Sequence, residues 1–241
     1  MAYAGGKAGA GVYQTLINLM PPHRIYIEPF AGSGAVMRHK RPAQINIGVD
    51  LDARTIKYLH PEASPEIAMM PALSAATIQM TQSALDFLRS FNFQGDELVY
   101  SDPPYLMSVR QSKKPIYKFE MTSEAEHREL IEILLKLPCM VMLSGYRSDL
   151  YDQLLARWRR VDYQTTNRAG QRVTESVWLN FPEPAELHDY SHLGRGFRER
   201  ERIKRKRKRW HDRIATMPAL ERHALLAAIQ DATEQLKHRR L

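Results

Sequence analysis

The chain has 241 residues, which is enough for one α/β domain and an appendage, and its formal net charge is +8. Its single cysteine, Cys139, excludes a disulfide framework and a zinc site built on several cysteines. No apolar run approaches the roughly 18 residues of a membrane span, and the first residues lack a signal-peptide pattern. We therefore expect a cytoplasmic protein in which Cys139 is a small core residue.

The positive charge is concentrated in one segment. Residues 195–213 hold eleven Arg or Lys and three Asp or Glu, whereas residues 1–194 hold 20 basic and 21 acidic residues. Residues 214–241 are close to neutral, with four basic and three acidic residues. This distribution indicates a contact with a polyanion rather than a generally basic surface.

The chain begins with two glycine-rich segments. Residues 1–11 form a loop whose only charge is Lys7, and by composition alone they would also fit a flexible terminus. A helix is expected over 12–20. Residues 25–29 (IYIEP) predict a strand, followed by the turn FAGSG and a helix from Ala35. A strand, a glycine turn and a helix open many nucleotide-binding sheets, because bare backbone lets a cofactor approach closely.

The next strand, residues 45–50 (INIGVD), ends on an acid. Asp50 is in a position to accept hydrogen bonds from both hydroxyls of a ribose, and Asp52 is a competing candidate two residues later. The sequence then predicts a helix and loop over 53–70, a strand over 76–82 and a helix over 84–91.

The central run is DELVYSDPPY, residues 96–105. Its apolar residues predict a short buried strand that Pro103 and Pro104 end, since neither can donate to a ladder. Asp102 then lies at the carboxyl end of the strand, and Tyr105 offers an aromatic face. Ligands bind beyond such strand ends in open parallel sheets, although a plain turn would also tolerate Asp-Pro-Pro.

The loop Leu106–Met121 leaves directly from this run. Its basic and aromatic residues fit either a lid that grips a nucleic-acid strand or a solvated loop. These residues are Arg110, Lys113, Lys114, Tyr117 and Lys118. Thr122 is expected to cap a helix over 123–137. The elements expected after it are a strand over 139–144, a short helix over 149–158 and a hairpin of 161–166 with 173–181.

The last part of the chain changes in character. We expect domain boundaries at 1–182, 183–196 (a linker) and 197–241 (a basic helical extension). A helix over 197–214 would place four arginines on one face, and a second helix is expected over 218–237. The arginines are Arg198, Arg202, Arg205 and Arg209. A helical hairpin and a solvated basic arm both fit this pattern.

EPFAGSG at 28–34 and DPPY at 102–105 resemble motifs I and IV of the Dam-like adenine-N6 DNA methyltransferases. With the Gly-Lys loop before them, the resemblance covers roughly residues 1–181, and LSGYRSDLYDQLL and RVTESVWLNF look like later blocks. The resemblance implies a doubly wound, seven-stranded Rossmann-like methyltransferase sheet with a C-terminal helical basic extension. It also implies S-adenosylmethionine as cofactor, DNA as partner and no need for a metal.

Residue by residue, the resemblance implies several roles. The implied cofactor contacts are Tyr3, Lys7, Glu28, Phe30, Gly32, Gly34, Asp50 and Asp102. The implied catalytic group is Asp102, Pro103, Pro104 and Tyr105. The expected nucleic-acid contacts are Arg110, Lys113, Lys114, Tyr117 and the four arginines of the basic helix. Ser83 stands where the family usually has an acid against the cofactor adenine, and a lone histidine such as His127 is more often structural than catalytic.

One departure from the family is large. Gly34 and Asp102 are only 68 positions apart, which leaves no room for the usual target-recognition domain. Recognition must come from the loop after DPPY, from the C-terminal helices, from a second subunit, or hardly at all. Methylation of adenine N6 in DNA, site-specific or relaxed, is the main hypothesis. RNA base methylation, cytosine-N4 methylation and a catalytically silent nucleic-acid-binding module are the alternatives.

Overall fold

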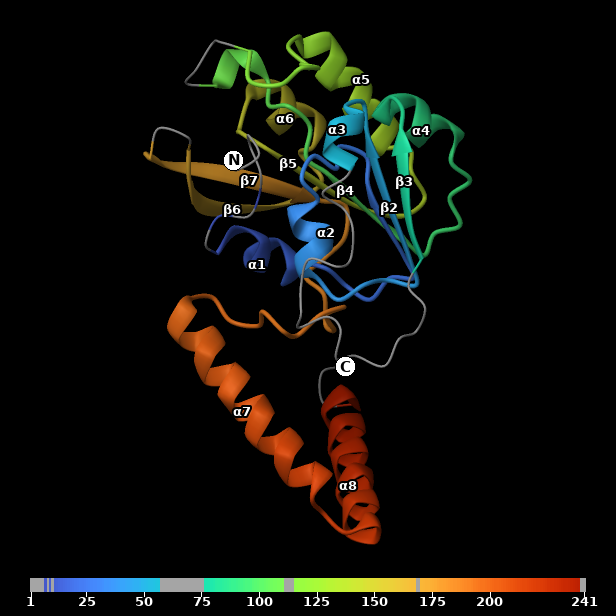
Figure 1. The fold of residues 1–241 in the computed structure, drawn as a ribbon, viewed down its shortest axis with the longest axis vertical. Helices are drawn as coiled ribbons and strands as arrows, with labels where there is room; N and C mark the ends of the chain where they lie inside the picture. The colour runs from blue at the N-terminus through green and yellow to red at the C-terminus, as the bar shows by residue number, and fades with distance from the viewer. Residues whose placement is uncertain are drawn as a thin grey trace. The chain divides into compact units, whose positions relative to one another are not determined.

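A computed structural model of the chain describes residues 7, 9, 11–56, 76–110, 115–167 and 170–238 (Figure 1). Two compact units follow each other along the chain, Met1–His192 and Leu193–Leu241. The first unit holds a sheet with helices on both faces, and the second holds two helices.

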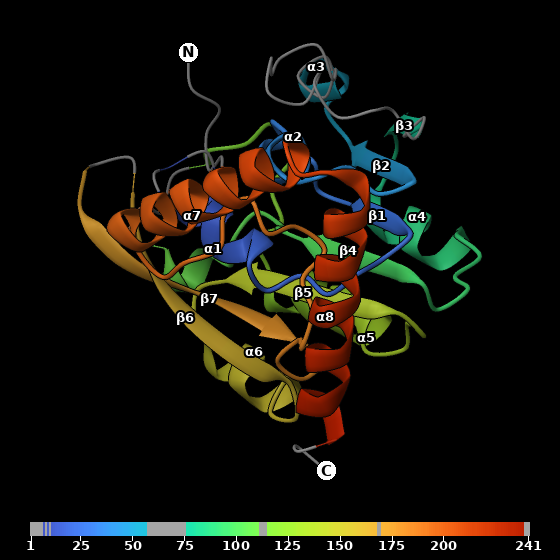
Figure 2. The ribbon, with the colours of Figure 1, turned by 90° about the horizontal axis from the view of Figure 1, so that it is seen from below.

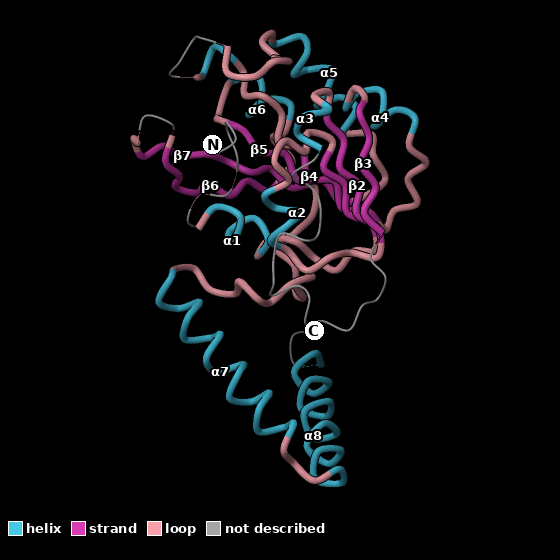
Figure 3. Tube along the Cα trace, in the orientation of Figure 1, coloured by secondary structure: helices cyan, strands magenta, loops and turns pink. Residues whose placement is uncertain are grey.

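Seven strands form a single sheet within the described residues, in the order β3-β2-β1-β4-β5-β7-β6 (Figure 3). They are β1 (Ile25–Glu28), β2 (Ile45–Asp50), β3 (Ala76–Thr81), β4 (Glu97–Ser101), β5 (Met140–Gly145), β6 (Arg159–Thr166) and β7 (Arg172–Leu179). The first five are parallel, and β7 runs antiparallel to both of its neighbours. The fold class predicted from the sequence is confirmed.

Helices cover both faces of the sheet. Their bounds are α1 (Val12–Ile17), α2 (Ala35–His39), α3 (Ala53–Ile56), α4 (Ala84–Ser90), α5 (Glu124–Leu134) and α6 (Asp149–Leu154), with a 3₁₀ turn at Met107–Val109. Side chains of α4, α5 and α6 pack into the core on one face, whereas those of α1 and α2 pack into the core on the other. In Figure 1, α1 and α2 accordingly lie on the opposite side of the sheet from α4, α5 and α6.

The middle of β4, Leu98–Tyr100, is apolar, and its packing shows why. Val99 packs into the core beneath α4, α5 and α6, whereas Leu98 and Tyr100 pack into the core beneath α1 and α2. Successive side chains of a strand point to opposite faces, so a central strand covered on both sides carries no polar alternation. β4 is thus a rigid support for the residues that follow it.

Several element ends differ from the sequence prediction. α1 ends at Ile17 rather than at 20, and α6 ends at Leu154 rather than at 158. Ser123, not Thr122, caps α5, because Glu126 three residues later returns a hydrogen bond to the Ser123 backbone N–H. Cys139 is buried, as expected.

The second unit contains α7 (Phe197–Ala215) and α8 (Ala219–His238), joined by a short turn (Figure 2). The predicted helical pair is confirmed, and α7 has no buried residue. No helix in the described part of the chain combines the length and apolar character needed to cross a bilayer.

Candidate active site

A cavity of about 490 Å³ opens where β1, β2 and β4 end. The predicted cofactor residues that line it are Lys7, Glu28, Phe30, Gly32, Asp50 and Asp102. Gly34 shapes the turn behind the cavity, and Tyr3 lies outside the described residues. Residues far apart in the sequence meet at this edge because parallel strands bring their carboxyl ends together.

The turn after β1 is built on glycines in the left-handed region. Gly32 has a φ of 50° and Gly34 a φ of 60°, and a side chain would strain both. Asp50, at the end of β2, fastens this turn: its Oδ2 accepts a hydrogen bond from the Gly32 N–H at 2.8 Å. Its Oδ1 accepts from the Asp52 N–H at 2.8 Å. The predicted ribose acid therefore also holds the backbone against which a cofactor would lie.

Asp52, the competing candidate for binding the ribose, forms an ion pair with Arg54. Its Oδ2 lies 2.6 Å from Arg54 Nη2, and its Oδ1 accepts from Arg54 Nε at 2.9 Å. The side chain lines the same cavity but already has a guanidinium partner. This geometry favours Asp50 for the ribose.

Glu28 is buried at the end of β1. Its Oε1 accepts hydrogen bonds from the Tyr26 hydroxyl and from the Met37 N–H, each at 2.8 Å. Burial raises the pKa of Glu28 to about 7, against the lowering effect of these two donors. Glu28 therefore gains or loses its proton near pH 7, and a cation bound in the cavity would favour its charged form.

Asp102 follows β4, and its carboxylate meets the ammonium of Lys7. Lys7 Nζ lies 2.9 Å from Asp102 Oδ1 and 3.1 Å from Glu175 Oε2, and it donates to the Tyr105 hydroxyl. Burial alone would lower the pKa of Lys7, but Asp102, then Tyr163 and Glu175, raise it well above its usual value. Burial raises the pKa of Asp102, and the Lys7 ammonium opposes that rise. Lys7, which was expected to contact the cofactor, thus contacts Asp102, the proposed catalytic acid.

The rest of the DPPY turn surrounds this pair. Pro103 is buried, and Pro104 lines the cavity. The half-buried Tyr105 ring packs edge-on against Tyr146, which follows β5, with 4.9 Å between ring centroids. The aromatic face that the sequence predicted at Tyr105 therefore has a second aromatic ring beside it.

Sequence reasoning missed Glu175. It lies on β7, is 8% exposed, and comes from the block RVTESVWLNF. The available signal was an acid inside a predicted strand whose second half is apolar, since a carboxylate is almost never buried without a partner. Its partners are far away in the sequence, so the pattern does not name them.

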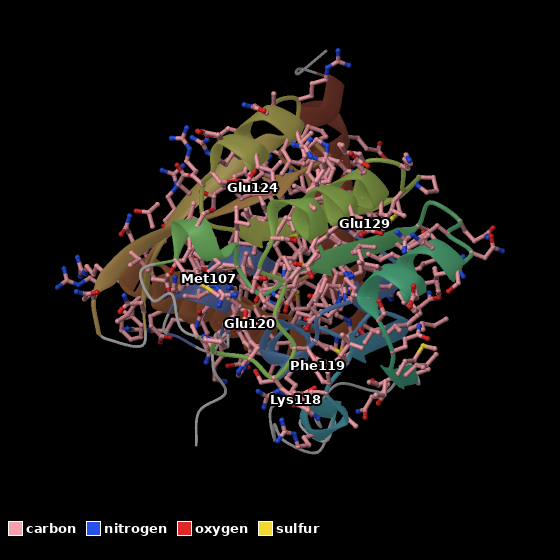
Figure 4. All side chains as sticks on the ribbon, turned by 90° about the horizontal axis from the view of Figure 1, so that it is seen from above. Met107, Lys118, Phe119, Glu120, Glu124 and Glu129 are labelled. Atoms are coloured by element: carbon pink, nitrogen blue, oxygen red, sulfur yellow. The ribbon has the colours of Figure 1, made fainter. Side chains whose placement is uncertain are left out.

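The loop after DPPY is organised by Glu120. Its carboxylate pairs with Arg110, with 2.5 Å between Arg110 Nη2 and Glu120 Oε2, and its Oε1 accepts from the Ile116 N–H at 2.6 Å. Arg110 Nε also donates to the Tyr105 carbonyl oxygen. Figure 4 shows Glu120, Phe119 and Lys118 following one another along this loop.

Arg110 was predicted to contact nucleic acid, but its side chain is buried and engaged within the loop. This placement favours a role in holding the loop on the DPPY turn. Tyr117 lines the cavity, and burial raises its pKa to about 12. Lys113 and Lys114, the other predicted contacts of this loop, lie outside the described residues.

Two further polar residues have local partners. Ser83 caps α4 by accepting a hydrogen bond from the Asp86 N–H, and it also lines the cavity. His127 is fully buried, with Nδ1 2.9 Å from the Tyr151 hydroxyl and Nε2 3.0 Å from the Met121 carbonyl oxygen. His127 thus ties α5 to α6 and to the end of the DPPY loop, which agrees with the structural role expected for it.

In the second unit, the predicted basic face forms a shallow groove on α7. The groove is lined by Arg198, Arg202, Arg205, Lys208, Arg209 and Asp212. The four arginines predicted to share one face therefore do so. Arg202 has a partner at helical spacing in Glu199, with 3.6 Å between Nη2 and Oε1.

A family model described as "D12 class N6 adenine-specific DNA methyltransferase" matches residues 57–168, which include DPPY. No curated protein matches the chain. One similar solved structure is magnesium protoporphyrin IX methyltransferase from Synechocystis PCC 6803 with bound SAM. The two sequences are 11% identical, the match covers 69% of this chain and 74% of that chain, and the TM-score is 0.42. A SAM-dependent methyltransferase from Methanosarcina mazei has 11% identity, 68% and 95% coverage, and a TM-score of 0.46.

The sheet, the cavity at its edge and the DPPY turn define a Rossmann-like methyltransferase. The family match specifies the type and confirms the resemblance stated from the sequence. Together they indicate an S-adenosylmethionine-dependent enzyme of the type that methylates adenine N6.

Proposed function

We propose that Asp102 receives the adenine amino group and that the residues after it hold the base. The observation that supports this is the placement of Asp102: it follows a strand covered on both faces, lines the cavity and meets the Lys7 ammonium. Pro103, Pro104 and Tyr105 complete the group, with Tyr105 as the stacking face for a base that is flipped out of a duplex or arrives single-stranded.

The residues lining the cavity fit the cofactor. The cavity volume falls within the roughly 300–1,000 Å³ of small-ligand sites, and glycine backbone forms part of its wall. Asp50 would hold the ribose hydroxyls, Glu28 would face a positively charged group, and Phe30 and Ser83 would border the bound molecule. For Tyr3 and Gly34 we propose the cofactor contacts that the resemblance implies.

The chemistry asks little of the protein beyond positioning. When bound, S-adenosylmethionine supplies an electrophilic methyl group, whose bond to sulfur breaks with the electron pair staying on sulfur. The Asp102 carboxylate and the Pro103 carbonyl each accept one amino N–H, which turns the nitrogen lone pair toward the methyl. The N6 proton becomes acidic only as the new N–C bond forms, and it then passes to the Asp102 carboxylate or to water, so Asp102 need not be a strong base. Holding the reacting atoms in line supplies the remaining acceleration.

Mass spectrometry of nucleosides tests the proposed substrate. DNA and RNA are each incubated with the protein and cofactor carrying an isotope-labelled methyl group, then digested. We expect label in N6-methyl-2′-deoxyadenosine from DNA. Label confined to RNA nucleosides, or in N4-methylcytosine, would contradict the proposal. A DNA substrate also agrees with the cytoplasmic location predicted from the sequence.

Replacing Asp50 with alanine should weaken cofactor binding by ~1–3 kcal/mol, the range for losing a buried, charged hydrogen-bond partner. The loss has two sources, the ribose hydroxyls and the Gly32 N–H that Asp50 holds. Calorimetry with S-adenosylmethionine measures it. Asp52→Ala is the matched control, and a larger loss in that variant would transfer the ribose role to Asp52.

Cofactor affinity should fall as the pH is lowered from about 7 to about 6. The pKa of Glu28 is raised to about 7, so Glu28 is increasingly protonated below that pH, and a bound cation requires the carboxylate. Binding must then release a proton, which weakens affinity by up to about tenfold per pH unit. Glu28→Gln should be weak and independent of pH in this window. Glu124→Gln, an exposed change on α5, should keep the wild-type pH dependence.

We also propose that the two units have different functions, catalysis in the first and DNA binding in the second. The first carries the methyltransferase site, and the basic groove on α7 contacts the phosphate backbone of DNA through Arg198, Arg202, Arg205 and Arg209. Its support is the charge of residues 195–213 together with the single face that these arginines share.

A further inference from the structure

One carboxylate oxygen of Glu175 accepts hydrogen bonds from three donors. Glu175 Oε2 lies 3.1 Å from Lys7 Nζ, 2.8 Å from the Tyr105 hydroxyl and 3.0 Å from the Tyr163 hydroxyl. The donors come from the N-terminal loop, from the DPPY turn and from β6. A single buried atom therefore connects three separate parts of the site.

The sheet explains how Glu175 reaches this position. Because β7 is antiparallel to β5, Ser176 pairs with Gly145 at the carboxyl end of β5, and Glu175 lies one residue further on. Glu175 also pairs with Tyr163 in the ladder of β6 and β7. It thus stands at the same sheet edge as Asp102 while remaining inside regular structure.

Burying a carboxylate is costly unless donors compensate for the lost water. Here the compensation comes from groups that belong to the active site. Lys7 stands between two carboxylates, Asp102 at 2.9 Å and Glu175 at 3.1 Å, so its charge is divided between them. The Tyr105 hydroxyl donates to Glu175, which fixes the direction of the ring that the base would stack on.

We propose that Glu175 is a positioning residue for methyl transfer: it draws the Lys7 ammonium partly away from Asp102 and anchors the Tyr105 ring before the base arrives. The proposal rests on the proposed role of Asp102. Without the Glu175 charge, Lys7 pairs with Asp102 alone and competes with the adenine amino group for the carboxylate. Glu175 also raises the pKa of Asp102, so its loss lets that pKa fall.

The test is Glu175→Gln, measured by single-turnover methyl transfer across a pH series. The amide keeps the size and an acceptor but removes the charge. We expect methyl transfer to slow by roughly tenfold to hundredfold, the cost of a small misplacement at a reacting centre. We also expect the acidic limb of the pH profile to move to lower pH, which loss of packing would not cause. Glu175→Asp keeps the charge and should restore the position of that limb.

Glu97→Gln is the matched control. Glu97 is a fully buried carboxylate at the start of β4, where it accepts hydrogen bonds from the Gln94 and Gly95 N–H groups, at the opposite edge of the sheet. Its replacement removes a buried charge of the same kind and should leave the pH profile unchanged. A wild-type rate and profile in Glu175→Gln would overturn the proposal, as would the same displaced limb in Glu97→Gln.

A second readout does not depend on turnover. Lys7 is titrated with an amine-reactive reagent and its modification is followed by peptide mass spectrometry. Because Glu175 raises the pKa of Lys7, Lys7 should react at lower pH in Glu175→Gln than in the wild type and in Glu97→Gln. Unchanged Lys7 reactivity would contradict the proposal even if the variant were inactive. Full activity in an Asp102 variant would instead contradict the proposed function, so the two failures are distinguishable.

Discussion

Replacing Asp102 with alanine will abolish detectable methyl transfer while the protein stays folded. Alanine has no oxygen to accept an N–H from adenine and no charge to stabilise the nitrogen as it becomes positive. Losing one such acceptor costs at least roughly 10²–10³-fold in rate. Lys7 keeps Glu175 as a partner, so its buried ammonium is not left alone.

The measurement is single-turnover transfer of a labelled methyl group to DNA, with thermal unfolding to establish that the variant folds. Asp152→Ala is the control, because Asp152 is a carboxylate on α6 that pairs with Arg147 and Arg160 and does not line the cavity. It should keep wild-type activity. A fully active Asp102 variant would remove this residue from the reaction.

Neutralising the basic groove of α7 will weaken DNA binding and flatten its dependence on salt. The triple change Arg198, Arg202 and Arg205 to Gln removes three charges from the groove. Each lost phosphate contact lowers the log–log salt slope by roughly 0.9 on duplex or about 0.7 on single strands. We therefore expect a slope lower by roughly 2.7 on duplex or about 2 on single strands. Sequence preference should change little, because phosphate contacts carry no sequence information directly.

The same helix supplies a matched control. Arg200, Lys204 and Arg207 lie on the opposite side of α7 by helical periodicity and do not line the groove. Their replacement by Gln removes the same charge, so a general electrostatic effect would lower the slope equally. Cofactor affinity, measured by calorimetry, should be unchanged in both triple variants. Equal slopes in the two variants would contradict a specific groove contact.

The fold was largely predictable because its signals are local. Apolar runs ended by glycine or proline identify strands such as β4, and the glycines of EPFAGSG require a tight turn whatever lies around it. The cap of α5 shows the limit of this reasoning: Thr122 and Ser123 are both good capping residues. Only the spacing to Glu126 selects Ser123.

The candidate site was predictable where a motif names a residue, and not where the role depends on a distant partner. Lys7 was assigned to the cofactor, but its closest charged partner is Asp102, 95 positions away. Arg110 was expected to face nucleic acid, yet Glu120 engages it inside the loop. Both outcomes depend on how the chain brings segments together, which a linear pattern does not contain.

The reversed direction of β7 has a consequence for how this site keeps its shape. In a fully parallel sheet, this edge is reached by strand ends and loops, whose atoms move most. Running β7 backwards brings residues of a hydrogen-bonded ladder to the same edge, and residues on regular elements hold functional groups more accurately than loops do. Glu175 is therefore held in place by the ladder of β6 and β7. Lys7 and Tyr105, which lie outside the ladder, both bind to its carboxylate.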